Sequence, residues 1–201
     1  MPRIFQTVVA PLFPPQGPVR VLLLGEAPGP RGADQSGIPF WGDRAGRPVY
    51  RALVAAGLAR VPEAAWPEWD GARFREEGLR PEVREVALSN AFPSCPTSDG
   101  EHFRAPTDAE LRSEANQARL RAELARASER CPGTLRVLTL GRRAAWLLER
   151  LEGGPAFELQ ALPHPSAQGL LQAAPGKGKG LRLADLEAEW EARLRDLVAP
   201  A

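Results

Sequence analysis

Two side chains with strong hydrogen-bonding chemistry lie far apart in this sequence, each just after an apolar run. Asn90 carries two donors and an acceptor on one flat head, which suits the edge of a nucleobase. His164 stands between Pro163 and Pro165, and the two prolines fix the direction of its imidazole by restricting the backbone. A fixed imidazole can donate a hydrogen bond to charge that develops on a leaving group. The alternatives are a turn residue bonded to its own backbone and an ordinary loop histidine.

The stretch from Gly25 to Gly46 is rich in glycine and proline, but it contains neither GxGxxG nor GxxxxGK[ST] and is therefore no standard phosphate loop. Phe40 offers a flat surface on which a base could stack, or it is a loop anchor buried against the core. The nearby carboxylates are candidates for orienting or activating a water molecule, with solvated charges or helix caps as the alternative. They are Glu26, Asp34 and Asp43.

A basic segment follows the His164 loop. Lys177, Lys179 and Arg182 lie among glycines without an acidic residue, so the segment could contact phosphate groups, or it is a flexible exposed loop. Among the aromatic residues, Trp66 and Trp69 are expected to pack rather than bind.

Four predicted strands must position these side chains, and the first of them, Val19 to Leu24, is nearly all apolar. They cover residues 19–24, 85–89, 135–140 and 157–162 and end at Gly25, Asn90, Gly141 and Pro163-His164. Helical patterns alternate with them, which predicts an α/β fold: a three-layer α/β/α domain with a central four-stranded parallel sheet, formed as a single domain by residues 1–201. Because ligands of such sheets bind outside the carboxyl ends of the strands, the four segments should converge on one site.

The expected helices differ in the clarity of their signals. One runs from Pro48 to Gly57, and one covers about 142–151. Another starts with a capping box at Thr107 and continues through an apolar stripe of Leu111, Ala115, Ala118, Ala122 and Ala125. A last helix has the stripe Leu183, Leu186, Trp190, Leu194 and Leu197. Residues 59–82 read as a polar connector, and 166–180 as a loop.

The composition narrows the class of protein. The chain has 201 residues, with 43% hydrophobic and 25% charged residues and a net charge of +1, which excludes a disordered chain and a strongly basic nucleic-acid arm. No apolar run approaches the length of a membrane span, and no signal-type segment follows Met1, so we expect a cytoplasmic protein without a membrane partner. The two cysteines, Cys95 and Cys131, cannot supply a four-thiolate metal site.

At these same positions the sequence resembles the uracil-DNA glycosylase superfamily. The first motif reads Gly25-Glu-Ala-Pro-Gly29 and is followed by Gly37-Ile-Pro-Phe40 and Gly42-Asp43-Arg-Ala-Gly46. The second is Ser89-Asn90-Ala91, and the third is His164-Pro165-Ser166. The Phe40–Gly46 run and Ala27 are similar to family 5, and Glu26 is similar to family 4. Several residues between Gly29 and Phe40 also resemble the single-strand-selective group.

The resemblance implies a role for each candidate. Asn90 would read the edge of uracil, Phe40 would stack on the base, and His164 would hydrogen bond to the oxygen of the departing base. Ala27 stands where several families place an Asp or Asn that holds the water molecule. That task would pass to Asp43, or failing that to Glu26.

The superfamily also places DNA contacts after the third motif. By this resemblance Ser166 would touch a phosphate group, the lysine pair Lys177 and Lys179 could do the same, and a wedge would fill the space of the flipped base. Candidates for the wedge are Gln168, Leu170 and Leu171. Families 4 and 5 carry a four-cysteine iron–sulfur cluster, which two cysteines cannot bind, so we expect no cofactor and no metal.

These features predict a DNA base-excision repair glycosylase, a hydrolase that flips and removes uracil and leaves an abasic site. Hypoxanthine and xanthine are further candidate bases, because Ala27 leaves more room than a larger side chain. The expected partner is DNA that contains a deaminated base, with a monomeric protein. The alternatives are a non-catalytic nucleic-acid-binding member of the same fold, which Ala27 motivates, and an unrelated nucleotide enzyme on an α/β sheet.

Overall fold

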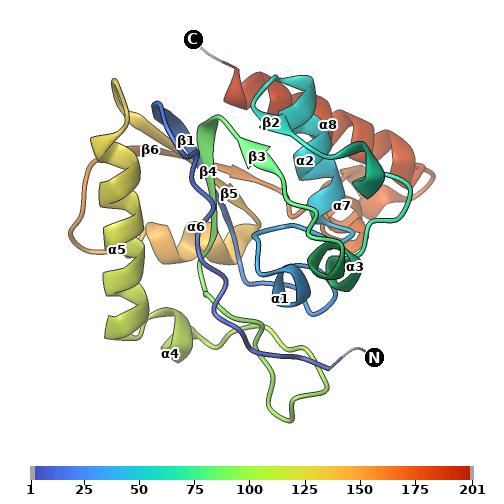
Figure 1. Cartoon of the computed structure of the whole chain (residues 1–201), viewed down its shortest axis with the longest axis horizontal. Helices are drawn as coiled ribbons and strands as arrows, with labels where there is room; N and C mark the ends of the chain where they lie inside the picture. The colour runs from blue at the N-terminus through green and yellow to red at the C-terminus, as the bar shows by residue number, and fades with distance from the viewer. Residues whose placement is uncertain (1–2, 200–201) are drawn as a thin grey trace.

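A computed structural model describes residues 3–199 of the chain (Figure 1). The principal strands are β1 (Val19–Gly25), β4 (Glu85–Asn90), β5 (Leu135–Leu140) and β6 (Phe157–Leu162). The larger helices are α2 (Gly46–Ala55), α5 (Glu114–Glu129), α6 (Arg142–Leu148), α7 (Ala167–Ala173) and α8 (Leu183–Val198). Shorter elements are α1 (Ala33–Ser36), α3 (Gly71–Glu76), α4 (Asp108–Leu111), β2 (Ala59–Arg60), β3 (Glu82–Val83) and the 3₁₀ turns η1 (Glu63–Ala65) and η2 (Pro175–Gly178).

The central sheet has four strands in the order β4-β1-β5-β6, and each neighbouring pair is parallel. This confirms the predicted parallel sheet. The register of β1 and β4 places Gly25 directly beside Asn90, and that of β5 and β6 pairs Leu140 with Leu162. The carboxyl ends of all four strands therefore lie at one edge of the sheet, as expected for strands joined by helical crossovers.

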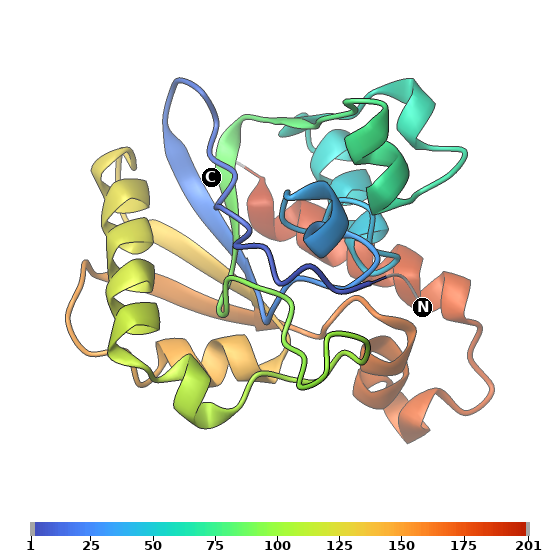
Figure 2. The same cartoon turned by 60° about the horizontal axis from the view of Figure 1, so that its bottom comes forward.

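Helices cover the two faces of the sheet, so the domain has three layers (Figures 1 and 2). Leu22 and Leu24 of β1 pack on one face with residues of α5 and α6, while Val21 and Leu23 pack on the other with residues of α2 and α8. Successive side chains of a strand point to opposite faces, so a strand buried on both faces must be apolar throughout. The predicted three-layer α/β/α architecture is confirmed.

The segment 59–82 is more than the polar connector that its composition suggested. It contains β2 paired with β3 in antiparallel register, the turn η1 and the helix α3. Its aromatic residues join Trp41 and Tyr50 in one cluster of edge and stacked contacts, with Trp66, Trp69 and Phe74 as members. The expectation that Trp66 and Trp69 pack rather than bind agrees with this cluster.

The helix predicted behind Thr107 is interrupted. The capping box at Thr107 is present, but α4 ends after one turn, and a new cap at Ser113 starts α5. The restart shifts the helical phase, so the predicted alanine stripe faces outward, with Ala115, Ala118 and Ala122 exposed. The buried face consists of Asn116, Leu120, Glu123, Leu124 and Ala127. The two polar members of this face, Asn116 and Glu123, support the site.

Residues 166–180 form α7 and η2 rather than one loop. The C-terminal stripe is confirmed, because Trp190 and Leu194 of α8 are buried in the core and Leu183, Leu186 and Leu197 pack against it. No helix in the described residues has the length and apolar character that crossing a membrane requires.

Candidate active site

A cavity of about 340 Å³ opens at the carboxyl edge of the sheet, a size within the roughly 300–1,000 Å³ typical of small-molecule sites. Residues from all four strand ends and from the loop after β1 line it. They include Gly25, Glu26, Ala27, Phe40, Asp43, Asn90, Leu140, His164 and Ser166. The predicted convergence of distant segments on one pocket is thus present in the structure.

Phe40 lies on the cavity wall because its backbone is held in an uncommon conformation. Its φ is 61°, in the left-handed region that non-glycine residues rarely adopt. The neighbouring Trp41 is fully buried and donates its indole N–H to the carbonyl of Leu79 at 2.9 Å, so it anchors the loop, while Phe40 is only partly buried against the core. A Cβ at Gly25 would lie 2.6 Å from Cε1 of the Phe40 ring, so only glycine there leaves room for the ring.

Asn90 ends β4 and is 3% exposed. Its Oδ1 atom lies beside Gly25, where a Cβ would approach it to 2.6 Å. Its Nδ2 atom is buried and has no hydrogen-bond partner among the described residues. Buried polar groups are nearly always paired in native structures, so this amide is a candidate for binding a ligand.

A polar network on α5 holds the end of β4, and the sequence did not reveal it. Arg119 donates to the carbonyl oxygen of Asn90 at 3.0 Å and to Glu123 at 2.5 Å. The Ser89 hydroxyl donates to Glu123 at 2.6 Å, and the Asn116 amide donates to the Ala91 carbonyl at 2.9 Å. These bonds fix the backbone on both sides of the Asn90 side chain.

His164 follows β6 and faces the same cavity. The backbone N–H of Ser166 donates to Nδ1 of the imidazole at 3.2 Å. With Nδ1 acting as acceptor, the proton of the neutral ring is on Nε2. Burial lowers the pKa of His164, which keeps the ring neutral near pH 7. Gly169 leaves space for the carbonyl and Cβ of His164, and a Cβ at that position would clash with both.

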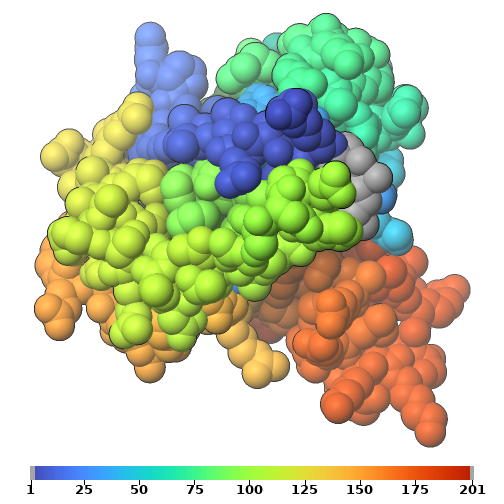
Figure 3. Space-filling model, turned by 90° about the horizontal axis from the view of Figure 1, so that it is seen from below, coloured from blue at the N-terminus to red at the C-terminus, as the bar shows by residue number. Residues whose placement is uncertain are grey.

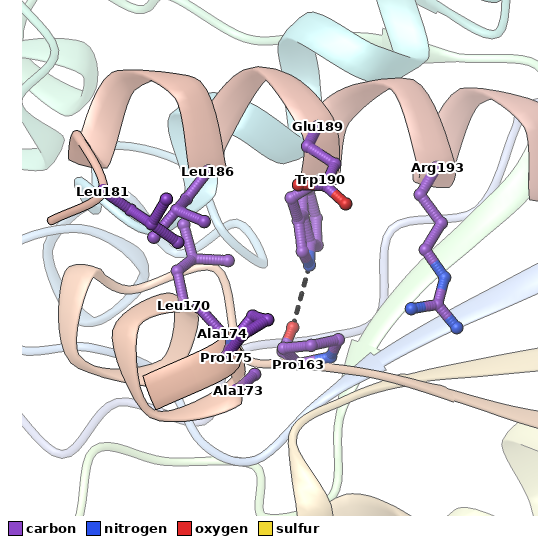
Figure 4. A pocket seen from close by; sticks show the side chains of 10 residues that line it. All are labelled: Pro163, Leu170, Ala173, Ala174, Pro175, Leu181, Leu186, Glu189, Trp190 and Arg193. Carbon is purple, nitrogen blue, oxygen red and sulfur yellow. Dashed lines mark hydrogen bonds between the residues drawn. The ribbon is translucent and has the colours of Figure 1, made fainter. Parts of the chain in front are cut away.

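Trp190 of α8 supports the backbone just before the imidazole. Its indole N–H donates to the carbonyl oxygen of Pro163 at 2.9 Å, and this bond crosses a second cavity that lies between α7 and α8 (Figure 4). Leu170 and Leu186 line that cavity together with Trp190. None of its lining residues lines the cavity at the carboxyl edge of the sheet, so the two cavities are separate.

Asp43 packs against the backbone of the loop after β1. Its Oδ2 atom accepts a hydrogen bond from the Ala33 N–H at 3.1 Å, and Gly29 and Gly32 leave space for its carboxylate. Burial raises the pKa of Asp43 to about 6, although the backbone N–H groups around it act in the opposite direction. Trp69 donates to the backbone carbonyl of Asp43 at 2.9 Å, which links the backbone at Asp43 to the aromatic cluster.

Glu26 and Asp34 occupy different environments. Glu26 lines the cavity and forms an ion pair with Arg143 at 2.9 Å; burial raises its pKa and the guanidinium opposes the rise. Asp34 is buried away from the cavity lining and accepts from the Phe5 N–H at 2.8 Å. Asp34 therefore ties down the N-terminal segment and is no candidate for handling water, which corrects its inclusion among the candidates.

Comparison with known proteins agrees with this arrangement. The sequence model of the Uracil DNA glycosylase superfamily matches residues 12–187, which span all four strands of the sheet and the three motifs. The chain belongs to the uracil DNA glycosylase superfamily. A curated relative, the type-5 uracil-DNA glycosylase of Thermus thermophilus, is 47% identical over 45 residues. That match spans 22% of this chain and only 20% of the relative, so it shows local similarity to a family 5 enzyme.

The superfamily assignment raises the question of an iron–sulfur cluster, which the resemblance to families 4 and 5 implies. The residues present do not fit the four-cysteine cluster of those families, because it needs four thiolates and the chain has two cysteines. Cys95 is fully buried, and burial raises the pKa of its thiol to about 12, whereas a ligand must be a thiolate. Within residues 3–199, no group of three His, Cys, Asp or Glu side chains is arranged to hold a metal ion.

Among the residues predicted to contact DNA in this glycosylase-family domain, Ser166 lines the cavity, whereas Gln168 and the two lysines do not. Ser166 caps α7, and its hydroxyl oxygen accepts from the Gly169 N–H at 3.1 Å, so the hydroxyl proton remains available to a phosphate. Gln168 is exposed on α7. Lys177 on η2 and Lys179 just after it are exposed and do not line the cavity, so their contact with DNA stays a prediction.

The prediction that Leu170 could act as the wedge is wrong. It is 5% exposed and belongs to the hydrophobic core, because α7 turns this side chain inward against α8. The segment was expected to be a loop, in which the leucine would have been free to project outward. A side chain packed in this way cannot enter a base stack.

Proposed function

We propose that this protein is a monofunctional DNA glycosylase that hydrolyses the bond between uracil and deoxyribose and leaves an abasic site. The observation that carries the proposal is the buried Nδ2 of Asn90, which has no hydrogen-bond partner within residues 3–199 and belongs to a cavity that Phe40 and His164 also line. An unpaired buried donor costs about 1–3 kcal/mol, so this site favours a ligand with an acceptor at that point. The O4 carbonyl of uracil supplies one.

The Asn90 amide also accounts for discrimination between bases. Uracil presents an acceptor at O4 beside a donor at N3, which complements the donor and acceptor of a carboxamide. Cytosine presents an amino donor in place of O4, so its donor would face Nδ2 and leave both unpaired. Sites built on such hydrogen bonds reject the mismatched analogue by about 10⁴-fold or more.

The Phe40 ring would stack on a base that lies in the cavity. Aromatic stacking is worth about 1–3 kcal/mol per base and does not depend strongly on base identity. Its fixed backbone and the adjacent Gly25 would place the ring without a further loss of conformational freedom. Phe40 would thus supply affinity, while Asn90 would supply specificity.

His164 would stabilise the leaving base. When the C1′–N1 bond breaks, its electron pair moves to the base, which departs as an anion with charge on its oxygens. The neutral imidazole with its proton on Nε2 can donate to this charge while Nδ1 is held by the Ser166 N–H. One such preorganised donor is worth roughly 3–4 kcal/mol in the transition state.

Asp43 is our choice for the group that activates water. The water oxygen would bond to C1′, one of its protons would pass to the Asp43 carboxylate, and the released base anion would take a proton from solvent. A pKa near 6 keeps this carboxylate ionised at neutral pH and makes it more basic than an ordinary aspartate. Glu26 is the second choice, because its ion pair with Arg143 reduces its basicity.

The residues that line the cavity also bear on the range of substrates and on the class of reaction. The small side chain of Ala27 on the cavity wall supports hypoxanthine and xanthine as additional substrates. The only lysines of the chain, Lys177 and Lys179, do not line the cavity, which argues against a Schiff-base lyase step. We further propose that the chain acts as a single-domain monomer on DNA in the cytoplasm.

The test is a substrate panel on the purified protein. Single- and double-stranded oligonucleotides that carry uracil, hypoxanthine or xanthine are incubated with the protein and then treated with alkali, which cuts at abasic sites. We expect scission with uracil and none with a matched oligonucleotide that contains cytosine or thymine. No scission with any of the three deaminated bases contradicts the proposal.

A non-catalytic DNA-binding role is the second candidate. It is favoured by Ala27, which cannot hold a water molecule, and by the engagement of Asp43 with the backbone of its own loop. Tight binding to uracil-containing oligonucleotides without release of free base would select this function.

A further inference from the structure

A glycosylase that acts on duplex DNA must fill the space that a flipped base leaves. Flipping costs a few kcal/mol of stacking and pairing, and DNA-bending proteins commonly insert an apolar side chain between base steps. The segment after His164 offers little for this task. Leu170 is in the core, Leu171 is half-buried beneath Gly178, and the exposed Gln168 is polar.

Phe103 has the required properties. It is 49% exposed, it lines the base cavity, and it comes from the loop between β4 and α4. In the view from below, this yellow-green loop and the orange segment after β6 lie on either side of a furrow (Figure 3). Among the described residues the other exposed large apolar side chains are Phe5, Val8, Val54 and Leu181, and none of these four lines the cavity.

The exposure of Phe103 is not the result of a loose loop tip. Asp99 accepts hydrogen bonds from the backbone N–H groups of Glu101 at 2.9 Å and His102 at 2.8 Å, and its second oxygen lies 2.7 Å from Nδ1 of His102. Thr97 forms a backbone bridge with Phe103 across the same turn. The residues on the amino-terminal side of the ring are therefore fixed.

The carboxyl-terminal side is fixed as well. Arg104 forms two hydrogen bonds with Glu110, at 2.7 and 2.6 Å, and Glu110 is the capping-box residue of α4. The Arg104 N–H also donates to the Pro96 carbonyl at 3.1 Å. An apolar ring held in water by anchors on both sides is preorganised for a partner, because little conformational freedom remains to be lost on binding.

We propose that Phe103 is the wedge that enters the base stack of duplex DNA while the target base occupies the cavity. This inference rests on the proposed function, because it assumes that a flipped nucleotide is the ligand. Two exposed arginines, Arg31 and Arg44, also line the cavity and could bind phosphate groups of the DNA. The wedge would then come from the loop after the second motif instead of the segment after the third.

A wedge is needed only when there is a stack to fill, and this gives a direct test. Single-turnover release of uracil is measured for the wild type, Phe103→Ala and Phe103→Leu on matched single- and double-stranded oligonucleotides. We expect Phe103→Ala to lose about tenfold or more on the duplex and to keep its single-strand rate within about twofold, with Phe103→Leu intermediate. Phe5→Ala, at 45% exposure away from the cavity, is the matched control and should leave both rates unchanged.

Chemical complementation separates a wedge from a folding defect. A pyrene nucleotide opposite the uracil fills the stack and should restore most of the duplex rate of Phe103→Ala. Equal losses on both substrates would instead make the ring a cover over the bound base, and unchanged rates would mean that it does not act in flipping. Either result overturns the proposal.

A fluorescent readout keeps this test separate from the proposed chemistry. 2-Aminopurine beside the uracil brightens when the stack is disturbed, whether or not the base is cleaved. We expect the wild type to raise the fluorescence of the duplex and Phe103→Ala to raise it less. A wild type that brightens the probe without releasing uracil would contradict the proposed catalysis and support the wedge, whereas equal brightening by both proteins would overturn the wedge.

Discussion

The indole N–H of Trp190 donates to the carbonyl oxygen of Pro163 at 2.9 Å, and Pro163 is the residue immediately before His164. A buried residue of the last helix thus holds the backbone that carries the candidate leaving-group donor. The bond joins two elements far apart in sequence, and it acts on the imidazole through its position and not by contact with it. Trp190 is accordingly a positioning residue.

Replacing Trp190 with Phe keeps an apolar ring and removes the donor. We expect the single-turnover rate on uracil to fall by about tenfold because the imidazole is held less firmly, a loss comparable to 1.4 kcal/mol. The affinity for abasic product DNA should stay within about twofold, since Trp190 does not line the base cavity. Arg193→Ala, a change in the same neighbouring cavity without a bond to Pro163, is the control. Equal losses of rate and affinity would instead indicate general disruption of α8.

Asn90→Asp tests the reading of the base edge. The change replaces the Nδ2 donor by a carboxylate oxygen, which would face O4 of uracil, so two acceptors would meet. We expect uracil release to fall by about 10²-fold or more, because hydrogen-bonding sites reject such mismatches strongly. The backbone bond from Arg119 does not involve the side chain and should preserve the local fold, which thermal melting can verify. An unchanged rate would show that Asn90 does not read the base.

The sequence identified the positions of the strand ends well, for a physical reason. Strands buried on both faces are largely apolar, so the run Val21–Leu24 stands out, and Gly25 marks its end. Parallel pairing then brings those ends together without any knowledge of the loops. Asn90 and His164 could be placed in one cavity on this basis, whereas Phe40 lies inside the loop after β1 and its place followed from the family resemblance.

The buried polar residues of α5 that hold the end of β4 were not predictable in the same way. Asn116 and Glu123 are polar, so a helical pattern assigns them to the solvent face, and only the paired groups Ser89 and Arg119 make their burial favourable. The prediction for Leu170 was wrong in the opposite sense: a residue that was expected to project outward is buried, because α8 packs over α7. Local sequence does not encode partners that are distant along the chain.

His164→Ala removes the proposed donor to the departing base. The chemical step should slow by about 10²- to 10³-fold, the usual effect of losing one preorganised donor in a water-excluded site. Binding to a duplex that carries a non-cleavable uracil analogue should change much less, because the donor acts mainly on charge that develops in the transition state. Rapid-quench kinetics and fluorescence anisotropy measure the two quantities separately. A larger effect on binding than on chemistry would make His164 a structural residue.

The pH dependence of uracil release tests Asp43 as the base that activates water. A base works in its ionised form, and since burial raises the pKa of Asp43 to about 6, the carboxyl group is mostly protonated at pH 5 and mostly ionised at pH 7. The single-turnover rate should therefore rise between pH 5 and 7 with a midpoint near 6. Asp43→Asn keeps a side-chain oxygen that can accept from the Ala33 N–H but cannot take a proton, so it should lower the rate at pH 7 by about 10²-fold and abolish this rise.

The matched variant for this experiment is Glu26→Gln, which neutralises the other carboxylate of the cavity. If Asp43 is the base, Glu26→Gln keeps the midpoint near 6, because the titrating group is still present. If Glu26 is the base, the rise disappears in Glu26→Gln and persists in Asp43→Asn. The two profiles, recorded on a single-stranded oligonucleotide so that duplex opening does not limit the rate, decide between the two carboxylates.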